Sequence, residues 1–406
     1  MPGRRVAVTG LGVICALGKN TSEMCSALRA GRSGISPLQL VDPTKLRFQN
    51  GAEVRGFDPG EHFPGSLQDH LDRFAQFSVV AARQAVQDSG IPLSGELLDK
   101  TVIATGSCVG GQTTQDTGFV DLYQRGRGRV HPLTIPKVMG NAGAGHISME
   151  FGTTGPAFNV STACSSSNHA IGQAFHMIRS GMAEVAITGG GEAPFSLGLL
   201  KAWEAMRVIS PDTCRPFSKN RLGMILGEGA GMLVLESLDA ARSRGAKIYG
   251  EVVGFGMSAD AHHLTAPSAQ GAASAMRRAL SDAGISPDQI GYINAHGTGT
   301  AANDPTETRA IRDLFGAHAD RLAVSSTKSM HGHGLGAAGA LESISTFLAL
   351  GEGYLPPTAN YIEPDPECDL DYVPNKARPA QVEWALSNSF AFGGLNAVLA
   401  FRTYPR

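Results

Sequence analysis

A cysteine between an apolar run and a group of small polar residues is the first feature of the sequence that predicts covalent chemistry. Cys164 lies in the stretch FNVSTACSSSNH at 158–169, and apolar residues at helical spacing follow at 170–178. This order predicts a strand, a sharp turn and a buried helix, with the thiol at the start of the helix. Unpaired backbone N–H groups and the positive end of the helix dipole favour a thiolate there. Cys164 is therefore a candidate nucleophile, and the competing interpretation is an inert cysteine of the core.

Three later glycine-rich motifs add two histidines to this cysteine. NAHGTGT at 294–300 contains His296, SSTKSMHGHG at 325–334 contains His333, and NSFAFGGLN at 388–396 precedes the last apolar run. We expect all three motifs at strand ends on the side of Cys164, where open α/β sheets place their sites. A cysteine with two histidines is compatible with a Cys–His hydrolase, a metal site or two structural histidines. The residue types alone leave these alternatives open.

The composition narrows the class of protein. The chain has 406 residues, is 42% hydrophobic, and carries 34 basic and 36 acidic residues, so a large core is possible and no general attraction to nucleic acid is implied. No stretch approaches the roughly 18 apolar residues that a spanning helix needs. The N-terminal apolar stretch is broken by Gly10 and Gly12 and predicts a buried strand, not a signal peptide. The 6 cysteines form no CxxC pair and no metal-ligand spacing, which indicates neither a disulfide framework nor a zinc site and fits the cytoplasm.

The two halves of the chain repeat the same order of segments. The matching pairs are 6–12 with 251–256, 81–91 with 275–285, 101–107 with 290–296, 158–162 with 322–326, and 229–236 with 393–401. Such a repeat indicates a duplicated α/β unit, with the cysteine in a half at 1–250 and both histidines in a half at 251–406. The runs 170–178 and 335–350 are apolar on nearly every face and predict helices sandwiched between the two sheets. The expected fold class is α/β, with five αβαβα layers and two pseudo-symmetric halves.

The four motifs together resemble the signatures of the elongating β-ketoacyl-acyl-carrier-protein synthases, a branch of the thiolase superfamily. VSTACSSS, NAHGTGT, SSTKSMHGH and NSFAFGGLN carry the resemblance, which runs over nearly the whole chain and includes the duplication. It implies the thiolase fold and the decarboxylative Claisen condensation of malonyl-acyl-carrier protein with a cysteine-bound acyl chain. Initiating synthases replace one histidine, and chain-length factors lose the cysteine. Thiolases use a second cysteine in a glycine-rich turn, whereas Cys368 lies in a Pro/Asp-rich loop.

The resemblance implies a role for each residue of the reaction centre. Cys164 would take the acyl chain as a thioester, with the backbone N–H groups of Cys164 and Phe392 as its oxyanion hole. His296 and His333 would be neutral and would donate N–H groups to the malonyl thioester carbonyl, which stabilises the enolate formed by decarboxylation. Phe392 also resembles the family's gating aromatic between the cysteine and the malonyl site.

Four further residues match supporting positions of the family. The resemblance implies that Lys328 and Glu342 order the site electrostatically. Thr298 and Thr300 resemble the hydroxyls that contact phosphopantetheine. That group is carried by the acyl-carrier protein, so the resemblance implies no cofactor and no metal bound by the chain itself.

Departures from the family pattern concern the acyl chain. Val109 takes the place of a common isoleucine at the acyl tunnel, and Thr134 stands where an aromatic is frequent. Leu395 removes a hydroxyl from the last motif, and Ala391 replaces a glycine of the Phe392 hinge, which stiffens it. These changes imply a reshaped tunnel. The segments KAWEAMR, PDTCRPF and PPTANY look closer to nodulation-type and aryl-polyene-type synthases, which build unsaturated and often conjugated chains.

The resemblance also implies partner proteins. Two segments, 35–77 and 112–149, occur only in the first half, and long irregular insertions of this kind usually carry binding or subunit contacts. The carrier protein is anionic, and its candidate contacts, each of which competes with ordinary solvated charge, are Arg73, Arg125, Arg127, Arg129, Lys201 and Arg207. A dimer is expected edge to edge near Asn159, with a second copy or with a chain-length-factor-like subunit. The alternatives for function are a housekeeping elongating synthase and a subunit that needs such a partner.

Overall fold

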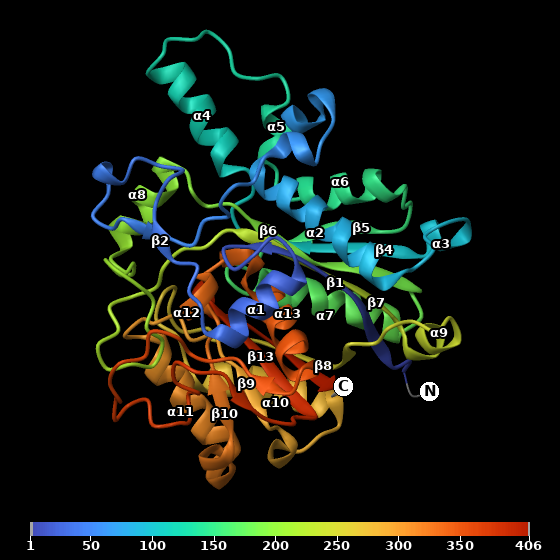
Figure 1. Ribbon diagram of the computed structural model, residues 1–406, viewed down its shortest axis with the longest axis vertical. Helices are drawn as coiled ribbons and strands as arrows, with labels where there is room; N and C mark the ends of the chain where they lie inside the picture. The colour runs from blue at the N-terminus through green and yellow to red at the C-terminus, as the bar shows by residue number, and fades with distance from the viewer. Residues whose placement is uncertain (1–2, 405–406) are drawn as a thin grey trace.

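Ten strands form one mixed sheet in the computed structural model, which describes residues 3–404. Read outward from the centre, the order is β1-β7-β6-β4-β5 on one side and β8-β14-β13-β9-β10 on the other, so the two halves have the same topology (Figure 1). The strands are β1 (Val6–Cys15), β4 (Thr101–Gly106), β5 (Ala157–Val160), β6 (Val185–Glu192), β7 (Gly229–Ser237), β8 (Gly250–Ala259), β9 (Tyr292–Asn294), β10 (Ala323–Ser325), β13 (Trp384–Ala391) and β14 (Leu395–Thr403). Four short strands pair outside this sheet, namely β2 (Ser36–Pro37), β3 (Asn50–Gly51), β11 (Tyr354–Leu355) and β12 (Arg378–Pro379).

Helices cover the sheet and fill the space between its halves. The helices are α1 (Thr21–Ala30), α2 (Arg73–Ser89), α3 (Glu96–Asp99), α4 (Gln112–Tyr123), α5 (Thr134–Val138), α6 (Ala142–Phe151), α7 (Ser166–Arg179), α8 (Leu197–Met206), α9 (Leu238–Ser243), α10 (Ala269–Ala283), α11 (Asn303–Phe315), α12 (Lys328–His331) and α13 (Ala338–Gly351). Two 3-10 turns also matter for the site, η6 (Leu335–Ala337) and η7 (Phe392–Gly394).

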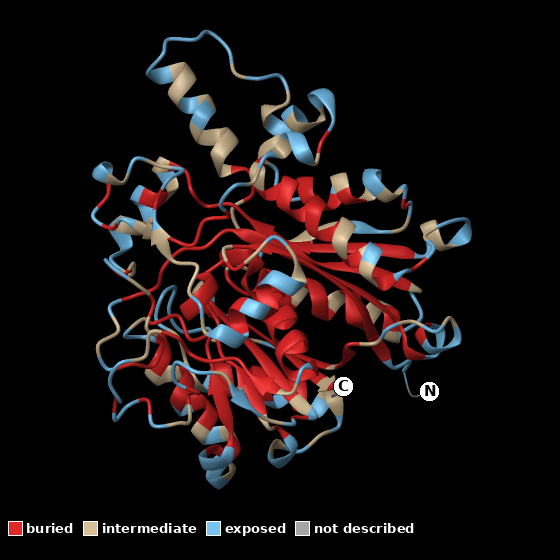
Figure 2. Cartoon of the chain, viewed as in Figure 1, coloured by how far each residue is buried: buried red, intermediate tan, exposed pale blue. Residues whose placement is uncertain are grey.

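The two predicted core helices, α7 and α13, contact each other and strands of both halves. Every residue of α13 is buried, as its small and apolar composition on all faces requires. Helices α2 and α10 pack on the outer faces, and the buried residues gather along these layers (Figure 2). The five-layered αβαβα arrangement is therefore confirmed. The two β layers are continuous halves of one sheet and not the two sheets expected from the sequence, because β1 and β8 pair over three residues, Val6–Val8 with Gly250–Val252.

The carboxyl ends of the parallel strands position the three motifs and the cysteine. Strand β4 runs parallel to β5 and β6, and β9 runs parallel to β10 and β13. Cys164 follows β5 and precedes α7, which confirms the predicted strand, turn and helix. His296 follows β9, the Lys328 motif follows β10, and Phe392 follows β13. Each half thus sends its reactive side chains from the ends of its parallel strands.

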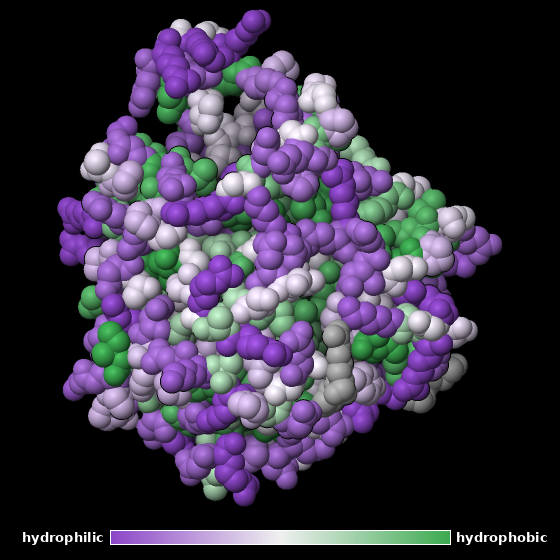
Figure 3. All heavy atoms as spheres, in the orientation of Figure 1, coloured by the Kyte–Doolittle hydropathy of each residue, from purple (hydrophilic) through white to green (hydrophobic). Residues whose placement is uncertain are grey.

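The segment 112–149 is more regular than expected. It forms α4, α5 and most of α6, and α4 projects from one end of the molecule (Figure 1). Its exposed apolar side chains are Phe119, Tyr123, Ile135, Met139 and Met149. Elsewhere the face seen in Figure 3 is mostly hydrophilic, with hydrophobic residues in small separate groups. None of the helices within 3–404 combines the length and hydropathy that a membrane crossing requires.

Candidate active site

A tight turn presents the Cys164 thiol at the end of β5. Ala163 adopts a φ of 51°, in the left-handed region that residues with a Cβ usually avoid. The Ser165 hydroxyl holds this turn, since its one O–H lies within hydrogen-bond distance of two carbonyls, that of Thr162 at 2.8 Å and that of Leu395 at 2.9 Å. Leu395 belongs to β14, so the turn is tied to the second half of the chain. A strained turn that is held by hydrogen bonds is typical of functional positions.

His296 is fixed from two directions. The Glu307 carboxylate of α11 accepts hydrogen bonds from the backbone N–H of His296 at 2.9 Å and of Gly297 at 2.8 Å. The Lys328 ammonium donates to the carbonyl of His296 at 2.7 Å and lies 3.3 Å from its Nδ1. An ammonium has no acceptor capacity, so Nδ1 accepts and the ring proton is on Nε2.

His333 has the same tautomer for a different reason. Its Nδ1 accepts the backbone N–H of Leu335 at 3.1 Å, which leaves the ring proton on Nε2. The ring centroids of His296 and His333 lie 5.4 Å apart, and the ring planes meet at 83°. One nitrogen of each ring and the Cys164 Sγ all lie within 4.8 Å of one another. The neighbouring His331 does not join them, because both of its nitrogens are engaged, by Thr327 and by a backbone carbonyl.

Burial sets the protonation of these groups. It lowers the pKa of His296 and of His333 well below the ordinary value, with the Lys328 charge acting in the same direction. Both rings are therefore neutral at pH 7, as the resemblance implies. Burial also raises the pKa of the Cys164 thiol to about 11, against the opposing effects of Lys328 and of the backbone N–H groups of Phe392 and Cys164. The thiolate expected at the helix start is not the resting form, because desolvation of the charge outweighs those donors.

Lys328 and Glu342 form an ion pair beneath the histidines. Both side chains are fully buried and in hydrogen-bond contact. Burial raises the pKa of Glu342 to about 7, and Lys328 opposes that shift. A buried charge of this kind needs its partner, so the pair places a compensated cation next to His296.

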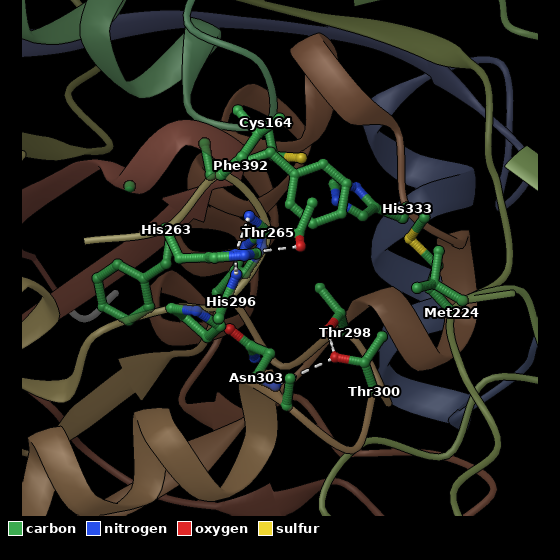
Figure 4. Close-up of a pocket in the computed structure, with 18 of the residues that line it drawn as sticks. Cys164, Met224, His263, Thr265, His296, Thr298, Thr300, Asn303, His333 and Phe392 are labelled. Carbon is green, nitrogen blue, oxygen red and sulfur yellow. Dashed lines mark hydrogen bonds between the residues drawn. The ribbon is translucent and has the colours of Figure 1, made fainter. Parts of the chain in front are cut away.

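One cavity connects these groups to the surface. It is lined by Cys164, His296, His333 and Phe392, which come from four different loops and face one another (Figure 4). The hydroxyls of Thr298 and Thr300 lie 2.9 Å apart on one wall. The sequence interpretation missed several wall residues, which are Trp203, Val208, Met224, Asn303 and the loop at 263–267. Trp203 lies in the KAWEAMR segment at 201–207, whose spacing gives no signal that the indole faces the cavity.

Comparison with known proteins identifies the family. Residues 3–241 match the family model described as Beta-ketoacyl synthase, N-terminal domain, and residues 249–362 match its C-terminal domain. The chain belongs to the β-ketoacyl synthase family. The resemblance seen in the motifs is thereby confirmed, together with the α/β thiolase fold.

The relatives of this synthase match over its whole length. Nodulation protein E from a Rhizobium species is 47% identical over 403 residues, 98% of this chain and 99% of that protein. The 3-oxoacyl-[acyl-carrier-protein] synthase 2 of Synechocystis is 42% identical over 409 residues, 99% of this chain and 98% of that protein. Among solved structures, the ishigamide ketosynthase/chain length factor has a TM-score of 0.95 and 40% identity, and covers 99% of this chain and 100% of its own. A type II polyketide acyl-carrier protein in complex with its ketosynthase bound to the hexaketide has a TM-score of 0.90, 30% identity, and coverage of 99% and 100%.

The three residues expected to shape the acyl tunnel of the synthase lie outside the wall of this cavity. Val109 is in the turn after β4, where its N–H lies 3.4 Å from the buried Glu192 carboxylate. Thr134 starts α5 and faces a separate polar pocket beneath α4. Leu395 starts β14 and is 36% exposed. Their influence on the acyl chain stays a prediction.

The basic residues expected to contact the carrier protein differ in their exposure and in whether they already form ion pairs. Arg73 is a poor candidate, because its guanidinium forms two hydrogen bonds to the buried Glu228 and its side chain is only 18% exposed. Arg125 and Arg127 pair with Asp121, and Lys201 pairs with Glu204. Of the six candidates, Arg129 and Arg207 are the two whose exposed side chains form no ion pair with residues 3–404.

Proposed function

We propose that this chain catalyses the decarboxylative Claisen condensation of malonyl-acyl-carrier protein with an acyl chain bound to Cys164. One observation supports it above all others. A thiol and two neutral imidazoles, both with the proton on Nε2, converge within 4.8 Å in a buried cavity. The thiol can accept the acyl group, and the two N–H donors can hold one carbonyl oxygen.

Acyl transfer comes first. The sulfur of Cys164 attacks the acyl thioester, and the carbonyl oxygen accepts hydrogen bonds from the backbone N–H groups of Cys164 and Phe392, which face the thiol. The carrier thiol leaves with the proton that Cys164 gives up. Preorganised donors of this kind stabilise the negative charge of the tetrahedral intermediate without reorganisation.

Condensation follows on the same sulfur. The malonyl thioester oxygen accepts from the Nε2–H of His296 and of His333, carbon dioxide leaves, and the electron pair of the broken bond forms an enolate. Its carbon attacks the acyl carbonyl and expels the Cys164 sulfur as a thiolate, which takes a proton from water to restore the resting thiol. Neutral donors suit this step, because they stabilise the enolate without giving up a proton to it.

The carrier protein supplies the phosphopantetheine arm, and the hydroxyl pair of Thr298 and Thr300 is positioned to contact it. Arg129 and Arg207 are the exposed cations proposed to meet the acidic carrier surface. The six free cysteines support a reducing compartment, and we place the protein in the cytoplasm. The dimer forms through β5, with a second copy or with a chain-length-factor-like subunit.

We assign the chain to a specialised pathway for unsaturated or polyene chains. The support is the similarity to Nodulation protein E and to the ishigamide ketosynthase/chain length factor. The alternative is ordinary elongation of saturated chains, which the similarity to 3-oxoacyl-[acyl-carrier-protein] synthase 2 favours.

Intact-mass spectrometry tests the proposal. The protein is incubated with carrier-bound saturated and polyenoyl chains, and Cys164→Ala serves as the control. Mass gain by the wild type alone, with polyenoyl chains only, supports both the reaction and the pathway. Equal loading of saturated chains would instead assign the protein to ordinary elongation.

His296→Ala and His333→Ala should each slow the release of carbon dioxide from malonyl-carrier protein by about 10²–10³-fold. The condensing function is wrong if Cys164→Ala still condenses or if neither histidine variant slows decarboxylation.

A further inference from the structure

Trp203 lies on the wall of the reaction cavity and stacks on Phe392. The two ring centroids are 6.1 Å apart and the ring planes differ by 27°, a geometry in the range of favourable offset stacking. Trp203 belongs to α8, in which Leu200 is the one fully buried residue. The indole is therefore a main link between a surface helix and the aromatic ring beside Cys164.

The indole of Trp203 also has an unsatisfied hydrogen-bond donor. Its Nε1–H is shielded from solvent and has no hydrogen-bond partner among residues 3–404. A buried N–H without an acceptor is unfavourable, and buried tryptophans usually find one. Stacking thus stabilises the observed position of Phe392, whereas the unpaired donor makes the observed position of the Trp203 indole unfavourable.

The backbone next to Phe392 permits a second position. Gly393 and Gly394 have φ values of 80° and 69°, a region that glycine enters without strain. The N–H of Gly393 donates to the carbonyl of Leu264 at 2.7 Å, so the turn is held on its far side by the loop at 263–267. The phenyl ring can turn at this hinge, and Trp203 is the aromatic side chain against which it rests.

We propose that Trp203 is a positioning residue that holds the Phe392 ring in its closed place and releases it when an acyl chain reaches Cys164. The inference rests on the proposed condensation, in which Phe392 separates the cysteine from the malonyl site. Departure of the ring opens the cavity beside the indole, and the N–H of Trp203 then gains water as an acceptor. The stack therefore restrains acyl transfer until a chain is present.

Two variants of Trp203 separate stacking from bulk. Trp203→Leu removes the aromatic face, and we expect it to raise the rate constant for Cys164 acylation about two- to tenfold, the range that corresponds to one aromatic pair. It should leave the KM for the acyl donor unchanged and raise the carbon dioxide released per β-ketoacyl product. Trp203→Phe keeps a ring on Phe392 and should stay within about twofold of the wild type.

Fluorescence gives a second readout in a folded protein. The chain has two tryptophans, and Trp384 lies at the start of β13 against Arg402, outside the cavity wall. In Trp384→Phe the remaining emission reports Trp203, and acylation should shift it to longer wavelength, but not when Cys164→Ala is added.

The outcomes separate this inference from the function on which it rests. A wild type that takes up no acyl chain overturns both. A wild type that is acylated fully, with unchanged Trp203 emission and with the same acylation rate in Trp203→Leu, overturns the positioning role alone.

Discussion

Burial controls the reactive groups of the site more than neighbouring charge does. It is the largest cause of the lowered pKa of His296 and His333 and of the raised pKa of the Cys164 thiol. The resting site therefore holds a neutral thiol and two neutral rings above the Lys328–Glu342 pair. Cys164 must then become nucleophilic when a substrate is bound, because it is not a thiolate in the free protein.

The neutral resting form of the Cys164 thiol should be visible in the pH dependence of its alkylation. Because the pKa of Cys164 is raised to about 11, the thiolate fraction should grow about tenfold per pH unit between pH 7 and 9. We expect the rate of Cys164 alkylation by iodoacetamide, followed by intact mass, to rise in the same proportion. A rate that levels off near pH 7 would show that the helix start and the backbone donors outweigh desolvation after all.

The histidines should give decarboxylation a flat pH profile. Their pKa lies well below 6.5, so both stay neutral between pH 8 and 6, whereas two ordinary imidazoles would be mostly protonated at the lower end. We expect a constant rate of carbon dioxide release over this range. In the unfolded chain both imidazoles bind protons near pH 6.5, whereas in the folded protein they stay neutral at that pH. The free energy of unfolding should therefore decrease as the pH falls below 6.5. An activity that halves at pH 6.5 would contradict the assigned protonation.

At the scale of elements, the turn between β5 and α7 carries the clearest strain. Ala163 has a φ of 51°, and a β-branched side chain tolerates that region less well than alanine does. Ala163→Val should lower the free energy of unfolding by about 1–3 kcal/mol and displace Cys164, which slows acylation.

Ala163→Gly is the matched control for this turn, since glycine enters the left-handed region freely. It should retain the stability of the wild type in urea unfolding and keep Cys164 reactive. If the valine variant unfolds at the same urea concentration as the glycine variant, the turn is not strained in solution.

Local patterns predict the elements, and long-range contacts explain what sequence reasoning missed. The apolar run, the small residues and the helical spacing around Cys164 lie within 158–178, so β5, the turn and α7 can be read directly. The pairing of Arg73 with Glu228 joins residues 155 positions apart, and no pattern near Arg73 indicates it. The stack of Trp203 on Phe392 is also a long-range contact that no local pattern predicts. In the sequence, Trp203 looks like a residue of a surface helix and Phe392 like a residue of a glycine-rich motif.

At the scale of the molecule, β5 is an unpaired edge of the sheet among the described residues. The carbonyls of Pro156 and Val160 accept from Ile103 of β4 and from Ser107 just after it, so the alternation of a parallel ladder directs the N–H of Asn159 outward. Open edges of this kind are covered by pairing with another chain or protected from it.

We expect Asn159→Pro to turn a dimer into a monomer in analytical ultracentrifugation, because proline removes the outward N–H. Asn159→Ala is the control, since it loses the same side-chain contacts to Thr105 and Ser107 but keeps the backbone donor. Dimers in both variants would show that another surface joins the subunits.

The division of the reactive residues between the halves has a consequence for synthesis of the chain. Cys164 emerges from the ribosome well before His296 and His333, and its turn is braced by Leu395, which follows both histidines in the chain. A nascent or prematurely ended chain therefore carries the thiol without the two donors that decarboxylation needs. Decarboxylation of malonyl units therefore requires that both halves of the chain have been synthesised and have folded against each other.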